Sequence, residues 1–144
     1  MEIRVHQATV DDAEVLHELN GRFNGAGCTT LDLVRASLET NTQETVFLIE
    51  CGDTPAGFCC VQVFKSMCYN RYYAEITEFF IDEEYRRQGV GTELLKKAEE
   101  HFSQASLAGF QLFTGDDNWS AQAFYEHLGY KRMGEIMYRK RERS

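Results

Sequence analysis

A glycine turn at the start of a helix is the segment of this sequence with the clearest chemical capability. Residues 86–91 read Arg-Arg-Gln-Gly-Val-Gly, and residues 92–98 continue as a helical run. The first N–H groups of a helix have no intrahelical acceptor, and the helix dipole adds partial positive charge there. Glycines at positions 89 and 91 let the main chain approach phosphate oxygens closely. The pattern therefore predicts a site for a pyrophosphate-bearing ligand.

Two common phosphate-binding motifs do not match this turn. A dinucleotide-binding turn needs a third glycine, but the sequence has Leu94 at that position. That turn also follows its strand directly, whereas residues 82–88 separate the strand from the turn here. A Walker A loop needs Gly-Lys followed by Ser or Thr, which this segment lacks. Both interpretations are therefore rejected.

Hydrophobic periodicity predicts the elements that position the turn. Helices are expected to begin at the capping residues near 9–12, 29–30 and 118–120, and one more follows the turn to about residue 104. The unit formed by residues 72–114 favours local parallel pairing of its two strands. The expected fold class is α/β (α+β), in one domain over residues 1–144. Strands are expected at residues 3–5, 45–50, 56–65, 72–81, 110–114, 131–133 and 135–139.

Length and composition indicate a globular protein of ordinary type. The chain has 144 residues, 43% of them hydrophobic, and a single proline. No apolar stretch approaches the ~20 residues of a membrane span, and the N-terminus lacks the layout of a signal peptide. The net charge of −8 disfavours nucleic acid or an anionic membrane as partner and mildly favours a cationic one. The simpler explanation of the acidity is that it keeps the protein soluble.

The cysteines and histidines indicate a cytoplasmic protein without a metal site. The five cysteines are odd in number and include no Cys-x-x-Cys pair, so they are interpreted as reduced thiols. The four histidines are scattered, without a metal-ligand spacing. We therefore expect no bound metal.

Two motifs resemble the signatures of one enzyme family. Residues 85–95 contain the pattern Arg/Gln-x-x-Gly-x-Gly/Ala, which is similar to the acetyl-CoA motif of the GNAT family of N-acetyltransferases. Residues 118–130 resemble that family's second motif, an asparagine followed by Phe-Tyr and Leu-Gly-Tyr. The expected order of elements is also similar along the whole chain. The resemblance implies a GNAT fold: a twisted, mixed, mostly antiparallel sheet of six or seven strands, four flanking helices, and a splayed parallel strand pair at the acetyl-CoA site.

The resemblance implies that acetyl-CoA binds around the glycine turn. Backbone N–H groups would hold the pyrophosphate, and the amide chain of pantetheine would pair with the edge of the preceding strand. Two arginines at the mouth of the turn either bind phosphate or are solvated surface residues. Asn118 bonds the pantetheine, caps its helix, or does both. The implied donor-site residues are Phe79, Phe80, Ile81, Arg86, Arg87, Gln88, Gly89, Val90, Gly91, Thr92 and Asn118.

Amide formation from a thioester requires a proton acceptor for the amine and a proton donor for the departing thiolate. The resemblance gives Tyr125 the second role, although its spacing also fits an ordinary core aromatic. Glu78 or Glu75, on the strand before the turn, is the candidate base or amine-orienting carboxylate; each is alternatively a solvated carboxylate. The odd separation of the two points them to opposite faces of a regular strand, and a β-bulge between them would bring them to one side.

The predicted function is N-acetyltransferase, with a primary amine attacking acetyl-CoA directly in a ternary complex. Acidity favours a small cationic acceptor over a protein amino group. The tyrosine-containing segment 67–73 and the loop 23–27 are candidate acceptor walls, or simple connectors. A coenzyme-A-binding regulatory or interaction module with little turnover is the alternative, because a fold does not dictate a function. A homodimer is expected from similarity to the family.

Overall fold

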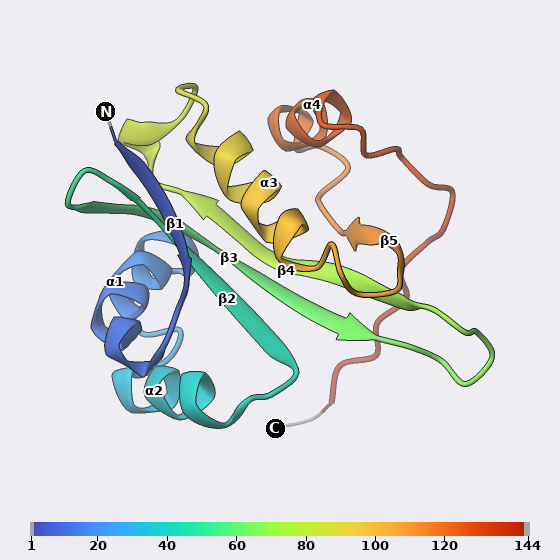
Figure 1. Cartoon of the computed structure of the whole chain (residues 1–144), viewed down its shortest axis with the longest axis horizontal. Coiled ribbons are helices and arrows are strands. Elements are labelled where there is room, and N and C mark those ends of the chain that lie inside the picture. The colour runs from blue at the N-terminus through green and yellow to red at the C-terminus, as the bar shows by residue number, and fades with distance from the viewer. Residues whose placement is uncertain (1, 143–144) are drawn as a thin grey trace. The chain divides into compact units, whose positions relative to one another are not determined.

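Five strands form one mixed sheet in the order β1-β2-β3-β4-β5 in the computed structural model, which describes residues 2–142 (Figure 1). The strands are β1 (Ile3–Gln7), β2 (Glu44–Cys51), β3 (Thr54–Phe64), β4 (Tyr72–Ile81) and β5 (Leu107–Leu112). The first four pair antiparallel in sequence, and β5 pairs parallel to β4. The expected mostly antiparallel sheet with one parallel pair is confirmed.

Four α-helices accompany these strands in the described chain: α1 (Ala13–Asn24), α2 (Leu31–Thr40), α3 (Val90–His101) and α4 (Trp119–His127). Short 3-10 turns at Val10–Asp12 and Glu83–Tyr85 precede α1 and the glycine turn. Thr9 and Asp12 form a capping box at the first 3-10 turn, and the Thr30 hydroxyl accepts from the Leu33 N–H at the start of α2. The capping residues therefore begin both segments as expected.

The prediction of strands at 131–133 and 135–139 is wrong. Within residues 131–142 the chain forms no helix or strand, so the sheet has five strands rather than six or seven. The large apolar side chains Met133, Ile136 and Tyr138 are exposed. Alternating apolar residues give a strand only where a neighbouring strand supplies hydrogen bonds and a face to pack against.

Contacts separate the chain into two compact units, one that ends at Phe113 and one that begins at Thr114. The first unit holds the sheet with α1, α2 and α3, and the second holds α4 and the C-terminal segment. A single acetyltransferase domain over residues 1–144 stays a prediction. No helix among residues 2–142 is long and apolar enough to cross a bilayer.

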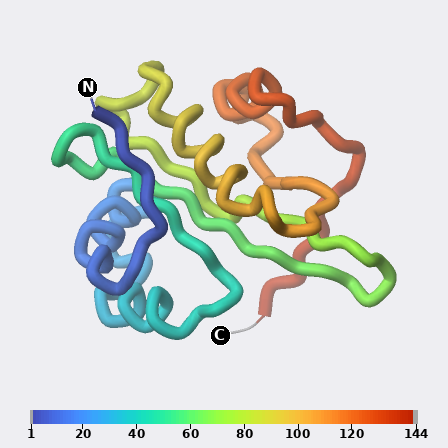
Figure 2. Tube along the Cα trace, viewed as in Figure 1, coloured from blue at the N-terminus to red at the C-terminus, as the bar shows by residue number. Residues whose placement is uncertain are grey.

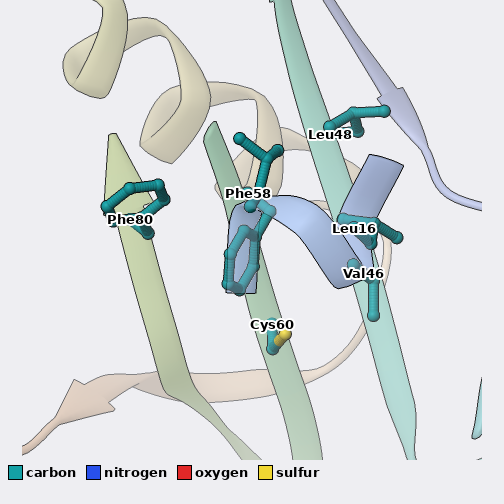
Figure 3. Close-up of a cluster of buried hydrophobic side chains, with 7 residues drawn as sticks. Leu16, Val46, Leu48, Phe58, Cys60 and Phe80 are labelled. Atoms are coloured by element: carbon teal, nitrogen blue, oxygen red, sulfur yellow. The ribbon is translucent and has the colours of Figure 1, made fainter. Parts of the chain in front are cut away.

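Different helices cover the two faces of the sheet in the first unit. Figure 2 shows α1 and α2 side by side, with α3 apart from both. Phe47 points to the α3 face, where its ring lies 5.1 Å from that of His101 and 6.3 Å from that of Phe102. The α1 side is packed by Leu16, Leu19, Val46, Leu48, Phe58, Cys60 and Phe80 (Figure 3). This alternation fixes which side chains of β4 face α1 and α2.

Candidate functional site

A β-bulge in β4 places Glu75 and Glu78 on the same face of the sheet. Glu78 pairs with Cys60 of β3, and Glu75 pairs with Gln62. The register shifts between Cys60 and Val61, so β4 carries one extra residue, Thr77, between the two pairs. The extra residue cancels the odd separation of the two glutamates. The bulge that would bring them together is therefore present.

The bulge creates two neighbouring rows of side chains across the α1 face. Val46, Cys60 and Glu78 are successive cross-strand partners in the first row. The second row crosses four strands, and in it Gln111 donates to the Glu75 carboxylate at 2.9 Å. Because cross-strand partners share a face, the Glu44 carboxylate of β2 lies on the same face of the sheet as the Glu75 and Glu78 carboxylates of β4. The second row consists of Glu44, Gln62, Glu75 and Gln111.

A cavity of about 410 Å³ opens on this face, between α1, α2 and the sheet. Glu78 and Glu44 line it together with the buried thiol of Cys60. Figure 3 shows the apolar part of the lining, with Phe58 and Cys60 on one strand and Val46 on the next. The helices contribute Leu16, Asn20, Asn24, Leu33, Val34, Ser37 and Leu38, and the loop between them contributes Cys28 and Thr29.

The cavity makes its carboxylates more basic than usual. Burial raises the pKa of Glu78 above its usual 4.5, although the side chain still reaches solvent. Burial and the nearby Glu78 charge also raise the pKa of Glu44, partly offset by a hydrogen bond with Cys60. Burial raises the pKa of the Cys60 thiol far above its ordinary value, so this thiol is a neutral packing group. In the described part of the chain, Glu44, Glu75 and Glu78 form no ion pair with a basic side chain.

The glycine turn that begins α3 contains two residues in the left-handed conformation. Gly89 is the N-cap with φ +80°, and Arg87 also takes a positive φ, +63°. The first intrahelical hydrogen bond runs from the Glu93 N–H to the Gly89 carbonyl at 3.1 Å. Within residues 2–142, the N–H groups of residues 88–92 have no backbone acceptor. N–H groups without an acceptor at the start of a helix are suited to bind an anion.

The two arginines of the turn differ in their surroundings. The Arg86 Nε donates to the Ile81 carbonyl at 2.9 Å, which ties its side chain to the end of β4. Arg87 is exposed, and its backbone has the positive φ given above. Both arginines are therefore exposed, and this hydrogen bond holds Arg86 at the end of β4.

β4 and β5 separate before β4 ends. Their last pair is Ile76 with Leu112, whereas β4 continues to Ile81. β5 begins at Leu107, earlier than the expected residue 110. Glu78 lies two residues beyond the last pair along β4, so the pairing with β5 ends beside the cavity rather than at the far end of β4.

In the second unit, the two residues singled out from the sequence lie on α4. The Asn118 Oδ1 accepts from the Ala121 N–H at 3.2 Å, so Asn118 caps its helix. Tyr125 is half-buried, with its ring 5.1 Å from that of Phe124 and 5.7 Å from that of Tyr130. The helix-capping interpretation of Asn118 is confirmed, and Tyr125 packs among aromatic rings.

Sequence reasoning missed Glu44, Cys60 and Gln111 as members of the site around Glu75 and Glu78. These residues come from three other strands, and only the strand register brings them together. A signal existed in the alternation of residues 44–48, where Glu44 shares the parity of Val46 and Leu48. Within residues 2–142, no group of three or more His, Cys, Asp or Glu side chains is placed to hold a metal ion.

Comparison with known proteins decides the family. The profile of the Acetyltransferase (GNAT) family matches residues 13–130. This chain belongs to the GNAT family. The matched residues include both the glycine turn and the motif at 118–130, so both motifs lie inside the region that matches the family.

Individual relatives match part of the chain in sequence, and a solved structure matches nearly all of it in fold. An uncharacterized N-acetyltransferase of Methanocaldococcus jannaschii is 33% identical over 62% of this chain, and N-alpha-acetyltransferase 30 of Homo sapiens is 33% identical over 64%. The matched regions span only 40% and 25% of those two relatives. An aminoglycoside acetyltransferase from a soil metagenome, solved with sisomicin, superposes with a TM-score of 0.83 over 99% of this chain and 97% of its own, at 11% identity. That likeness establishes the GNAT fold.

Proposed function

We propose that this protein transfers the acetyl group of acetyl-CoA to a primary amine that binds in the cavity beside Glu78. One observation carries the proposal: the bulge at Thr77 turns Glu78 into the cavity on the same strand whose end leads into the glycine turn. The proposed proton acceptor and the proposed anion site are thus connected by one short segment. Family membership supplies the reaction class to which this arrangement is suited.

The glycine turn is the proposed pyrophosphate site for acetyl-CoA. The N–H groups of Gln88, Gly89, Val90, Gly91 and Thr92 supply donors at the positive end of α3. A Cβ at Gly89 would meet no neighbouring atom, but the φ of +80° is a backbone conformation that residues other than glycine rarely adopt. The residues present therefore fit a diphosphate group, with Arg86 and Arg87 as flanking positive charges.

The segment of β4 after its last pair with β5 is the proposed pantetheine-binding strand. Phe79, Phe80 and Ile81 lie on this segment. An amide chain can add to a strand edge through main-chain hydrogen bonds, and a main-chain N–H here also suits the oxyanion that develops on the thioester. The thioester would then lie near Glu78, beside the acceptor cavity.

Glu78 is the proposed proton acceptor. An alkyl ammonium has a pKa near ~10 and must lose a proton before it attacks a thioester. A carboxylate with a raised pKa accepts that proton more readily than an ordinary surface glutamate. Glu75 is the second candidate, but its bond from Gln111 holds it in the neighbouring row. Direct attack by the amine requires no enzyme nucleophile, which agrees with the neutral thiol of Cys60.

Tyr125 and Asn118 complete the proposal from the second unit. We assign the Tyr125 hydroxyl the protonation of the departing thiolate, by family resemblance to the Phe-Tyr motif. Asn118 already uses its Oδ1 as a helix cap, and its amide Nδ2 stays available for a pantetheine carbonyl. Both assignments rest on the sequence motif at residues 118–130.

The cavity supports a small cationic acceptor. A volume of about 410 Å³ lies in the ordinary range for small-molecule pockets. Glu44 and Glu78 bring negative charge to its lining, and no basic residue of the described chain pairs with either. An ammonium group is the complement of that lining. The sisomicin-bound structural neighbour is named for action on an amine-bearing small molecule.

Acetylation of a protein amino group is the second candidate. The human relative is named as an N-alpha-acetyltransferase, and it shares 33% of residues with this chain over the matched region. A peptide would enter the same cavity through its terminal ammonium. A coenzyme-A-binding module with little turnover remains the alternative from a different functional class.

Release of coenzyme A thiol from acetyl-CoA across a panel of amines distinguishes these functions. The panel contains diamines, aminoglycosides and short peptides with free α-amino groups. We expect turnover with small diamines or aminoglycosides at least about tenfold above that with peptides, because two carboxylates line the cavity. Preference for peptides would favour the second candidate. Binding of coenzyme A without turnover on any amine would contradict the enzyme proposal.

A cytoplasmic homodimer is the proposed form of the protein. All five cysteines are free in the structure, as suits a reducing compartment. The exposed apolar side chains Met133, Ile136 and Tyr138 are the proposed source of an interface. Analytical ultracentrifugation measures the mass in solution, and a monomer at micromolar concentration would contradict the dimer.

A further inference from the structure

Two contacts attach the last turn of α1 to the end of β4. The guanidinium of Arg22 pairs with the carboxylate of Asp82, and the ring of Phe23 stacks on Phe80 with centroids 5.1 Å apart and planes at 27°. The Asp82 side chain is 17% exposed and that of Arg22 is 48% exposed. A largely covered carboxylate is thus paired with a cation that is still in contact with solvent. Arg22 also bonds Glu18 at 2.6 Å on its own helix.

Asp82 connects this contact to the glycine turn. Its N–H donates to the Ala56 carbonyl of β3 at 2.7 Å, and its carbonyl accepts from the Tyr85 N–H at 2.9 Å. It is also the N-cap of the 3-10 turn Glu83–Tyr85, which leads directly into the glycine turn. The backbone between Asp82 and the glycine turn is short and hydrogen-bonded, so a shift of the turn is expected to move Asp82 as well.

On the other side, α1 leads directly into a wall of the acceptor cavity. The helix ends at Asn24, and Cys28 and Thr29 of the following loop line the cavity. Gly25 and Gly27 in this loop have positive φ values, +99° and +86°, and the Asn20 amide bonds the Cys28 sulfur at 3.4 Å. The position of the last turn of α1 thus determines where this wall begins.

We propose that Arg22 and Asp82 are positioning residues that couple the glycine turn to the cavity wall formed by the α1–α2 loop. A ligand bound at the glycine turn would then restrain this loop around Cys28. The proposal rests on the proposed acetyl-CoA site. Ion pairs in which one partner still contacts solvent contribute modestly to folding stability, so the pair is expected to matter for this coupling more than for stability. Coupling of this kind changes how often the loop opens and needs no change in the average structure.

Alkylation of two exposed cysteines measures the coupling without knowledge of the acceptor. Cys28 reports on the loop, and Cys68, which is also exposed and lies between β3 and β4, is the internal control. Iodoacetamide reacts with the protein with or without saturating desulfo-coenzyme A, which has no thiol to consume the reagent. Peptide mass spectrometry then gives the rate at each site. We expect desulfo-coenzyme A to slow Cys28 about fivefold or more, in the range of ordinary coupling constants, and to leave Cys68 unchanged.

Variants separate the ion pair from direct shielding by the ligand. Arg22→Gln and Asp82→Asn should bind desulfo-coenzyme A in calorimetry but lose the protection of Cys28 to within about twofold. Glu18→Gln is the matched control, because it removes the other partner of Arg22 and should keep the protection. The charge-reversed double variant Arg22→Glu with Asp82→Lys should restore part of it.

Three results would overturn the proposal. Wild-type protein could bind desulfo-coenzyme A with Cys28 unchanged, or the Arg22 and Asp82 variants could keep full protection while they bind the ligand. Each of these results leaves the acetyl-CoA site intact and removes only the coupling. Absence of desulfo-coenzyme A binding to wild-type protein would instead remove the donor site, and with it the coupling.

Discussion

Replacement of Glu78 by glutamine removes the proposed proton acceptor with almost no change in side-chain size. The variant keeps the register partner Cys60 and the cavity lining, so the acceptor should still enter. General-base catalysis contributes about 10²–10⁴ in rate. Glu78 still reaches solvent, so water can partly replace it, and Glu75 lies on the same face. We therefore expect the low end of that range, about 100-fold in kcat/KM, or about 2.7 kcal/mol in transition-state free energy.

The pH dependence gives this prediction its sign. Glu78 acts as a base only when it is deprotonated, and burial raises its pKa above 4.5. As the pH drops through that raised pKa, Glu78 binds a proton and wild-type kcat/KM should therefore fall. This loss adds to the one caused by protonation of the amine itself. Glu78→Gln should lose this acidic limb and keep the dependence on the amine. The assay is thiol release at varied pH, with the constant background from the exposed Cys28 and Cys68 subtracted.

Glu75→Gln is the matched control for this experiment. It removes a carboxylate from the neighbouring row and should lower kcat/KM only a few-fold, because Gln111 already holds that side chain. A Glu78→Gln enzyme that keeps wild-type turnover and the acidic limb would refute Glu78 as the base. The same loss in Glu75→Gln, with Glu78→Gln unaffected, would transfer the role to Glu75.

Three further predictions concern the glycine turn, the Glu44 carboxylate in the cavity, and Tyr125 of α4. Gly89→Ala places a Cβ on a residue with φ +80°, so acetyl-CoA KM should rise about tenfold with kcat within about twofold, measured by steady-state kinetics. The raised pKa of Glu44 means that the folded state binds protons more tightly than the unfolded state, so stability falls as the pH rises above about 4.5. Thermal unfolding should therefore give Glu44→Gln a higher Tm than wild type near neutral pH, and this difference should disappear below about pH 4.5. Tyr125→Phe should lower kcat about tenfold or more without raising acetyl-CoA KM, and unchanged kcat would assign Tyr125 to packing alone.

Local patterns predicted the elements that carry the glycine turn. The boundaries of β4 at Tyr72 and Ile81 agree with the expected strand, because alternating and β-branched residues end at Asp82 and a 3-10 turn. The cap at Asn118 was also expected, since its side chain acts on an N–H three residues away. Both features depend on contacts that are local in the chain.

Features set by contacts between distant residues could not be predicted in the same way. The parity of Glu75 and Glu78 depends on one unpaired residue, Thr77, and the sequence allowed either outcome. The carboxylate of Glu44 joins the site only through the pairing of β2 with β3. The expected strands at residues 131–139 had the right alternation but no strand partner in the described structure.

A crystal structure with bound coenzyme A tests the central claim most directly. The account predicts the pyrophosphate within about 2.7–3.2 Å of backbone N–H groups among residues 88–92. It also predicts that the pantetheine lies along β4 beyond Ile76 and that its sulfur points toward the cavity that Glu78 lines. A pyrophosphate bound away from the glycine turn, or a sulfur on the opposite face of the sheet, would contradict it.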